Sequence, residues 1–383
     1  MRSHSSPARR NNRSQSIQAP AKAGAFCLSR RPAAAGKGEA MEQDQMKELP
    51  GLLLPWFREN ARALPWRQDR EPYRVWLSEI MLQQTRVEAV KGYYARFLQA
   101  LPDVFALAEA PEEQLLKLWE GLGYYNRARN LQKAARLVAY EKNGVFPDTY
   151  EGLLALPGVG EYTAGAVASI CFDRPCAAVD GNVLRVLSRY LANGGAAEEQ
   201  KKRFRQALEA VYPPGQCGAF TQALMELGAA VCLPNGAPLC EACPLAERCA
   251  AKKQGDPREY PRRETKKPRR RQARTVFLLD CGGRLAICRR PPRGLLAGLW
   301  QLPDTEGTLT PEQALEQVRR WGLQPSDLRS QRQRKHIFTH VEWDMTGYEI
   351  AVAGEGGPFL WATRQALAQQ YALPTAFRQF LEE

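Results

Sequence analysis

One acidic residue interrupts an otherwise apolar stretch near the start of the chain. From Val75 to Ala89 the residues follow helical spacing, and at 100° per residue the apolar side chains surround most of the axis, which predicts a buried helix. Glu79 falls among them. Burial disfavours the charged form of a carboxyl group, so we expect Glu79 to have a raised pKa and to hold a proton near neutral pH. The plainer alternative is an ion pair with Arg74 or Arg86.

A second carboxyl group stands where another helix should begin. Asp180 precedes the helical run Val183 to Leu191, and its side chain can cap the N-terminus of that helix. The positive end of the helix dipole favours the ionised form, so we expect Asp180 to stay anionic. A protonated acid and a carboxylate are the pair that glycosidic bond cleavage requires, provided that the fold brings them together.

A tight turn lies between these two acids in the sequence. Gly158 and Gly160, in the segment Leu-Pro-Gly-Val-Gly, allow the backbone to turn sharply and to approach another molecule closely. The small, apolar run from Thr163 to Ile170 predicts a packed helix after the turn. Free N–H groups at the start of that helix suit a phosphate. The alternative is a helix–turn–helix corner without a ligand.

Four cysteines within eighteen residues form the third candidate site. Cys232, Cys240, Cys243 and Cys249 are separated by seven, two and five residues, and at this density their thiolates can wrap one metal centre. Zinc would be favoured by paired Cys-x2-Cys knuckles. Here a single such pair is flanked by outlying cysteines.

Composition limits the remaining possibilities. The chain has 383 residues, enough for two domains, and a net charge of +13. Residues 1–40 and 261–274 together carry +14, so the charge says little about the folded parts. No histidine lies between residues 41 and 335, which excludes histidine general-base chemistry there. No apolar run is long enough for a membrane helix.

The segment "LPGVG", followed after about twenty residues by "VDGNV", resembles the helix–hairpin–helix DNA glycosylases of the endonuclease III family. The segment "SEIMLQQTRVEAV" at 78–90 resembles the adenine-specific, MutY-type members of that family. The resemblance extends from about residue 47 to the C-terminus. It implies a mostly α-helical helix–hairpin–helix domain with an iron–sulfur loop, joined to a C-terminal α/β domain that resembles the Nudix fold.

The resemblance also implies roles for individual residues. Catalysis would fall to Glu79 as acid, Asp180 as carboxylate, and Tyr162 and Asn182 as positioning groups. The adenine pocket would be lined by Trp66, Arg67, Leu82 and Gln222. DNA would be bound by Gln84, Thr85, Tyr124, Gly158 and Gly160, with Gln84 filling the space left by the flipped base and Tyr124 inserted beside the opposite strand.

Position 162 separates two mechanisms. Lyases of the family have a lysine there that forms a Schiff base with the sugar. In this chain the residue is Tyr162, and no lysine occurs from Gly144 to Gln200. The sequence therefore predicts a monofunctional enzyme that leaves an abasic site. The family also favours a 4Fe–4S cluster over zinc at the four cysteines, although its usual first spacing is six residues rather than seven.

The pattern changes to strands after residue 274. Residues 275–280, 284–290, 340–350 and 359–363 are predicted strands, with helices at about 311–321 and 374–382. A Nudix hydrolase needs an acidic box for magnesium, which is missing at 316–322, so this domain should bind rather than cleave. By resemblance, Phe338, Thr339 and His340 would contact 8-oxoguanine.

Together these observations predict the domain boundaries, the activity, the oligomeric state and the cellular location of the protein. We expect a disordered tail at 1–44, which could be a transit peptide or an upstream extension, a helical glycosylase domain at 45–255 with its cluster loop at 232–249, a basic linker at 256–273 and a Nudix-like domain at 274–383. The expected activity is removal of adenine opposite 8-oxoguanine or guanine in double-stranded DNA. We expect a monomer in the cytoplasm of a bacterium, associated with the nucleoid.

Three alternatives remain at this point. A lyase for oxidised pyrimidines is disfavoured by Tyr162 and by the second domain. A DNA-binding protein without catalysis is disfavoured because Glu79 and Asp180 are both present. A nucleotide pyrophosphatase is disfavoured because the acidic box is missing.

Overall fold

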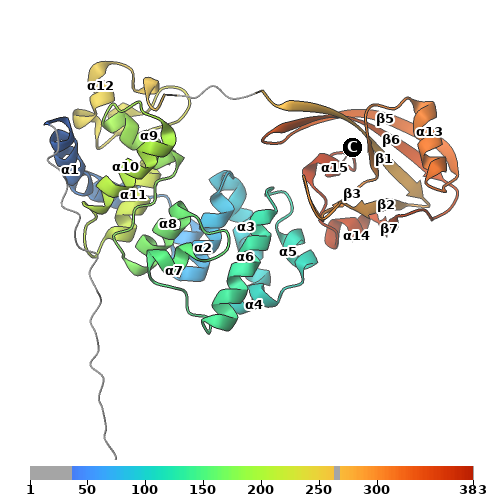
Figure 1. Cartoon of the computed structure of the whole chain (residues 1–383), viewed down its shortest axis with the longest axis horizontal. Helices are drawn as coiled ribbons and strands as arrows, with labels where there is room; N and C mark the ends of the chain where they lie inside the picture. The colour runs from blue at the N-terminus through green and yellow to red at the C-terminus, as the bar shows by residue number, and fades with distance from the viewer. Residues whose placement is uncertain (1–36, 263–267, 383) are drawn as a thin grey trace, which may run out of the picture. The chain divides into compact units, whose positions relative to one another are not determined.

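A computed structural model of the chain describes residues 37–262 and 268–382, with side chains from residue 42 onward (Figure 1). The predicted tail lies outside the described residues up to residue 36. Its last part was predicted wrongly, since residues 37–44 belong to helix α1, Lys37–Asn60. Strong helix formers such as Glu42 and Gln43 continue the helix toward the N-terminus.

Helices make up the part of the chain before residue 260. After α1 come α2 (Pro72–Leu82), α3 (Val87–Ala100), α4 (Val104–Glu109), α5 (Glu112–Leu118), α6 (Asn126–Arg136), a π-helical turn (Leu137–Glu141), α7 (Tyr150–Leu154), α8 (Glu161–Phe172), α9 (Gly181–Tyr190), α10 (Ala197–Glu209), α11 (Cys217–Ala230) and α12 (Ala250–Gln254). Short 3₁₀ turns lie at Pro65–Arg67, Cys240–Ala242, Ala246–Arg248 and Pro257–Glu259.

The helices form two large hydrophobic cores and one small cluster around Ile170. One contains α2 to α6 and the inner face of α8, with Trp76, Phe97 and Trp119 buried in it. The other contains α1, α9, α10 and α11 with the cysteine loop, around Phe204, Phe220 and Leu227. Helix α8 packs against both α2 and α11, so the space between the two cores is bordered by α2, α8, α9 and α11.

The helix predicted at residues 75–89 is in fact two helices. As expected, α2 is buried around its axis. It ends at Leu82, however, and α3 begins only at Val87. Gln84 has a φ of 59°, in the left-handed region, which is incompatible with a continuous right-handed helix. The apolar residues keep helical spacing across the turn, so the sequence pattern did not reveal this break.

The C-terminal part is a seven-stranded sheet with helices on both faces (Figure 1). The strands are β1 (Arg270–Cys281), β2 (Arg284–Arg289), β3 (Trp300–Gln301), β4 (Asp304–Glu306), β5 (Pro325–Ile337), β6 (Val341–Val352) and β7 (Leu360–Thr363). Their order is β3-β2-β1-β6-β5, with β4 paired to β1 and β7 to β2. Among the paired strands of the described residues, only β1 and β6 run parallel.

Alternation along β1 builds a core on each face of the sheet. Val276 and Leu278 point to the side covered by α14 (Arg364–Gln369) and α15 (Thr375–Arg378). Phe277 and Leu279 point to the side covered by α13 (Pro311–Arg320). This is the two-residue period expected of a strand buried on both faces.

The elements of this part differ from the prediction in several places. The linker predicted at 256–273 ends earlier, because strand β1 already begins at Arg270. The helix expected at 374–382 is reduced to α15, and α14 was missed. Strand β5 was also missed, since its segment Ser-Gln-Arg-Gln-Arg-Lys has no apolar side. It forms the edge of the sheet, where charged side chains are normal.

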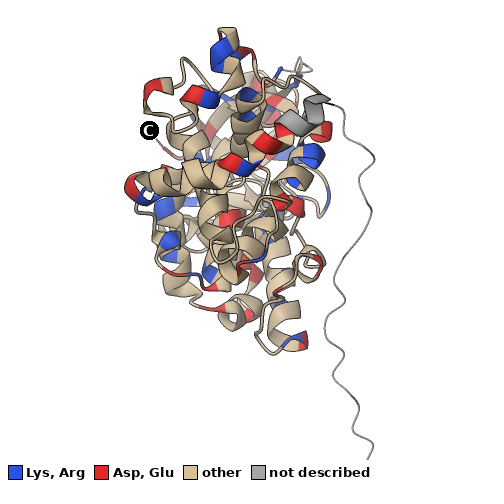
Figure 2. Cartoon of the chain, turned by 90° about the vertical axis from the view of Figure 1, so that its left-hand side faces the viewer, with Lys and Arg blue, Asp and Glu red and all other residues tan. Residues whose placement is uncertain are grey.

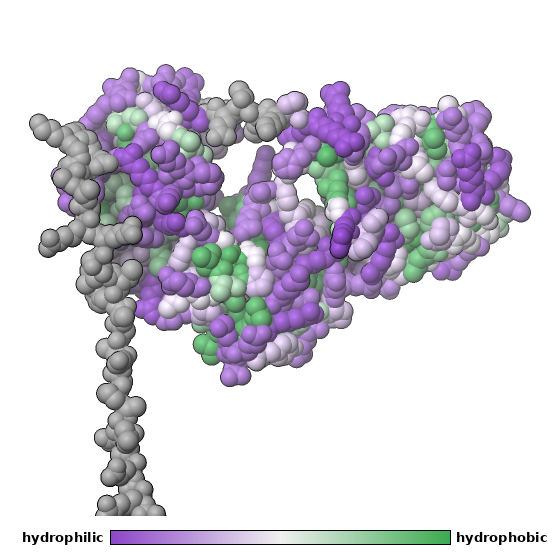
Figure 3. All heavy atoms as spheres, in the orientation of Figure 1, coloured by the Kyte–Doolittle hydropathy of each residue, from purple (hydrophilic) through white to green (hydrophobic). Residues whose placement is uncertain are grey.

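On the side of the chain drawn in Figure 2, backbone segments with Lys and Arg lie among segments with Asp and Glu. Figure 3 shows a mainly hydrophilic surface with separate apolar patches. None of the helices in the described residues is long and apolar enough to cross a membrane.

Candidate active site

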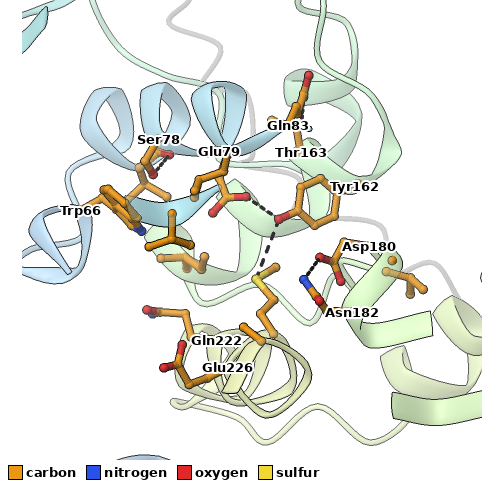
Figure 4. A pocket seen from close by; sticks show the side chains of 18 of the residues that line it. Trp66, Ser78, Glu79, Gln83, Tyr162, Thr163, Asp180, Asn182, Gln222 and Glu226 are labelled. Atoms are coloured by element: carbon orange, nitrogen blue, oxygen red, sulfur yellow. Dashed lines mark hydrogen bonds between the residues drawn. The ribbon is translucent and has the colours of Figure 1, made fainter. Parts of the chain in front are cut away.

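A cavity of about 710 Å³ opens between α2, α8, α9 and α11 (Figure 4). It brings together every residue expected to act on the base or the sugar. The lining includes Glu79, Tyr162, Asp180 and Asn182, as well as Trp66, Arg67, Leu82 and Gln222. The two carboxyl groups therefore share one cavity, although 101 positions of sequence separate them.

Glu79 is buried on α2 and faces Tyr162 on α8. The Tyr162 hydroxyl donates a hydrogen bond of 2.6 Å to Oε2 of Glu79. Burial raises the pKa of Glu79 and the nearby Asp180 adds to the rise, while the hydrogen bond from Tyr162 and the charge of Arg67 oppose it, which leaves a pKa of about 7. Arg74 pairs with Asp69 instead of Glu79. The ion-pair alternative for Glu79 is therefore wrong for Arg74, and the predicted direction of the pKa shift is confirmed.

Asp180 caps helix α9, as predicted. Its Oδ1 accepts from the backbone N–H of Val183 at 2.7 Å, and its Oδ2 accepts from Nδ2 of Asn182 at 2.7 Å. The predicted direction of its pKa shift was wrong, because burial raises the pKa of Asp180, and these hydrogen bonds only oppose that rise. The helix terminus alone did not reveal how little water reaches this carboxyl group.

Asn182 is itself held in place by α9 and α11. Arg185 donates from Nη2 to Oδ1 of Asn182 at 2.9 Å and to the carbonyl oxygen of Gly228 at 2.7 Å. A Cβ at Gly228 would meet the Asn182 Cβ at 2.6 Å, so only glycine allows this approach. Arg185 also donates from Nε to the carbonyl oxygen of Cys232 at 2.8 Å. A continuous series of hydrogen bonds thus joins Asp180 to the first cysteine of the loop.

A second buried glutamate at the cavity was missed by sequence reasoning. Both oxygens of Glu226 are paired, since Arg67 donates to Oε2 at 2.8 Å and Arg62 donates from Nη2 to the same oxygen at 3.0 Å and from Nε to Oε1. Burial alone would raise the pKa of Glu226, but the two arginines outweigh it and lower that pKa. The available signal was the spacing, because Glu226 lies four residues after Gln222 on one face of α11.

The residues expected to bind DNA lie at two places around the cavity. Gln84, Thr85 and Gly160 line the main cavity, and Gln84 is exposed. Gly158 and Tyr124 line a smaller cavity of about 200 Å³ beside it. Gly158 has a φ of 77°, which places the predicted tight turn before α8. Gly160 is the N-cap of α8 and has no side chain to occupy the free N–H groups.

The predicted recognition segment of the second domain forms the turn between β5 and β6. Phe338 is half-buried and packs edge-on against His336 and Trp343, with ring centroids 4.5 and 4.9 Å away. Thr339 and His340 are exposed. An aromatic side chain therefore anchors the turn.

The four cysteines gather beside α9. Burial and, to a smaller extent, the neighbouring Cys232, Cys249 and Cys240 raise the pKa of Cys243 to about 12, so the four thiols lie within electrostatic reach of one another. Arg189 donates to Sγ of Cys232 at 3.3 Å. Four thiols and an adjacent cation are a suitable donor set for a cluster of net negative charge. As the side chains stand, no group of three or more His, Cys, Asp or Glu in the described residues forms a ready metal site.

This fold and site define a helix–hairpin–helix DNA glycosylase. Residues 77–214 match the model of the HhH-GPD superfamily of base excision DNA repair proteins, and residues 275–383 match the NUDIX domain. A solved structure of a thermostable thymine-DNA glycosylase is 31% identical, with a TM-score of 0.50, and the match covers 55% of this chain and 98% of that one.

Comparison with curated sequences shows which family of DNA glycosylases the chain belongs to. The chain is 35% identical to the adenine DNA glycosylase of Homo sapiens, over 80% of this chain and 67% of the human one. It is 36% identical to the adenine DNA glycosylase of Rattus norvegicus, over 79% of this chain and 70% of the rat one. The chain belongs to the adenine DNA glycosylase family, and it is a DNA N-glycosylase of base excision repair.

Proposed function

We propose that this enzyme removes adenine paired with 8-oxoguanine or guanine in duplex DNA and leaves an intact strand with an abasic site. The observation that carries the proposal is the shared cavity, in which Glu79 is protonatable near neutral pH and Asp180 faces it from another helix. An acid for the leaving base and a carboxylate for the cationic sugar meet there.

Each step can be assigned to residues of the cavity. The flipped adenine enters among Trp66, Arg67, Leu82 and Gln222. The Glu79 proton passes to N7 of adenine, and the C1′–N9 bond breaks with both electrons leaving on the base. The carboxylate of Asp180, oriented by Asn182, stabilises the cationic sugar. Water then adds at C1′ and loses a proton, so one water is consumed for each adenine released.

The cysteine loop would hold a 4Fe–4S cluster through Cys232, Cys240, Cys243 and Cys249. When bound, such a cluster would supply a rigid, electrostatically defined support for the end of α9 rather than a chemical step. Arg185 and Arg189 both bond to Cys232 from α9, and Arg185 also bonds to Asn182. They would therefore connect the cysteine loop to the position of Asn182.

The second domain would inspect the base opposite adenine. The exposed hydroxyl of Thr339 can donate and accept hydrogen bonds, which suits the edge of 8-oxoguanine. The edge strand β5 leads into this turn, so the segment is held between two paired strands.

The activity is tested with duplexes that carry adenine opposite 8-oxoguanine, guanine or thymine, and a fourth with thymine glycol. We expect release of free adenine from the first two, and strand breaks only after alkali. Release of oxidised pyrimidine, or breaks without alkali, would contradict the proposal.

The monofunctional mechanism needs its own test, because Lys201 also lines the cavity. It lies one residue beyond the lysine-free stretch, and it pairs with Glu198 at 2.6 Å. We expect no adduct with borohydride for the parent enzyme and adduct formation for Tyr162→Lys. If the parent is trapped and Lys201→Ala is not, Lys201 is a Schiff-base lysine and the enzyme is a lyase.

A further inference from the structure

Arg127, near the start of α6, lies between the two loops that carry Gln84 and Tyr124. From Nη1 it donates to three carbonyl oxygens at the end of α2, those of Ile80 at 2.7 Å, Met81 at 3.1 Å and Gln83 at 2.6 Å. From Nη2 it donates to the carbonyl oxygens of Leu122 at 3.0 Å and Gly123 at 3.2 Å. One guanidinium therefore joins two loops that are about forty residues apart in sequence.

The charge of Arg127 is satisfied by carbonyl oxygens rather than by an acid. In the described part of the chain it forms no ion pair with a carboxylate, and its charge lies over the rings of Trp119 and Tyr124. Burial lowers the pKa of Arg127 to about 10, so it remains charged at neutral pH. A cation at the C-terminus of α2 is stabilised by the carbonyl end of the helix dipole.

Each of the two loops contains one exposed residue, other than glycine, whose backbone lies in the unfavourable left-handed region. Gln84 has a φ of 59° and Tyr124 a φ of 47°, and neither residue is glycine. Both side chains are exposed, and 50% of Tyr124 is accessible to solvent. Left-handed backbone at residues with a Cβ persists where surrounding contacts impose it, often at a functional site.

We propose that Arg127 is a positioning residue that fixes loops 83–86 and 121–124 relative to each other, so that Gln84 and Tyr124 enter the duplex as one unit. This inference rests on the proposed function, because it concerns extrusion of adenine from the stack. Arg127 does not line the active-site cavity. It holds the end of α2, on which Glu79 also lies, so extrusion and protonation share one support.

The test measures extrusion separately from bond cleavage. A duplex carries 2-aminopurine next to the target adenine opposite 8-oxoguanine, and its fluorescence rises when its neighbour leaves the stack. We expect Arg127→Met to slow this rise by about tenfold or more, the scale of losing several hydrogen bonds to one charged group. Arg127→Lys should recover only part of the loss, since a single ammonium cannot form the same fork.

The matched control is Arg136→Met. Arg136 lies on the same helix, is exposed, and donates to a single carbonyl oxygen, that of Ala108, at 3.0 Å. It should extrude adenine at the parent rate. All variants are compared at a temperature at which circular dichroism shows them folded.

A double-mutant cycle separates positioning from general stability. In a Gln84→Ala, Tyr124→Ala background, Arg127→Met should slow extrusion by less than about threefold, because the two side chains that Arg127 positions have been removed. An equal factor in both backgrounds, or extrusion by Arg127→Met at the parent rate, would overturn the proposal. If the parent extrudes adenine but releases none, the proposed function fails, while the fluorescence still tests Arg127.

Discussion

Two buried glutamates lie at the same cavity and differ in what surrounds their carboxyl groups. Glu79, on α2, meets the Tyr162 hydroxyl and has a pKa of about 7. Glu226, on α11, is paired with Arg62 and Arg67, and its pKa is lowered. Burial raises the pKa of both. The partner decides whether a buried acid keeps a proton to donate or serves as a fixed negative charge.

This difference in pKa shift also indicates a different role for each end of the cavity. At the Glu79 end, a proton can move to the leaving base. At the Glu226 end, the fixed carboxylate holds Arg67 against the cavity wall, where it can orient a base without exchanging protons. The following predictions test this division, from the largest expected effect to the smallest.

Glu79→Gln should nearly abolish adenine release. Glutamine keeps the size of the side chain and its contact with Tyr162, but it has no proton to donate. We expect single-turnover rates to fall by about a thousandfold or more, in the upper range for general acid catalysis. Duplex affinity should stay near that of the parent, measured by fluorescence anisotropy. Release at the parent rate would remove the acid assignment.

Glu226→Gln should reduce both stability and activity. The substitution leaves Arg62 and Arg67 partly buried without their counter-charge, which costs about 3 kcal/mol of unfolding free energy when a buried pair is broken. Urea unfolding gives this value. Release should fall by roughly ten- to a hundredfold as Arg67 loses its position, a loss of about 1.4 to 2.8 kcal/mol.

The pH dependence distinguishes the two acids more sharply. Glu79 acts in its protonated form, so with a pKa of about 7 the rate should fall as pH rises through 7, by about tenfold for each further unit. Asp180 acts as an anion, and its raised pKa should bring in a fall at acidic pH. Glu226→Gln should keep the alkaline limb. If it flattened that limb instead, Glu226 would be the titrating acid.

Arg185→Lys should have the smallest effect. Lysine keeps the charge but cannot hold Asn182, Gly228 and Cys232 together as the guanidinium does. We expect release to slow by about fivefold, because Asp180 keeps its bond to the Val183 N–H while Asn182 loosens. Arg203→Lys, at an exposed position on α10, is the control. Equal rates for both variants would show that Asn182 needs no support from Arg185.

Much of the site could be read from the sequence because the relevant signals were local. The glycine turn, the cap at Asp180 and the acid in an apolar helix each depend on neighbouring residues. Prediction from local sequence patterns failed where residues far apart in the sequence determine the structure. The arginine partners of Glu226 lie about 160 positions away, and the break in the helix at Gln84 is held by Arg127. Strand β5 was missed because its pairing with β6, rather than any apolar pattern, defines it.

The sequence by itself determined which groups could do chemistry: an acid among apolar residues, an acid before a helix, four closely spaced cysteines, and tyrosine in place of lysine at 162. Only the tertiary structure decided how burial and neighbouring groups shift their pKa values. It packed α2 and α8 against α9 and α11, excluded water from Asp180 as well as Glu79, and gave Glu226 its two arginines. A pKa depends on what surrounds a carboxyl group in space, and the chain order of residues does not contain that information.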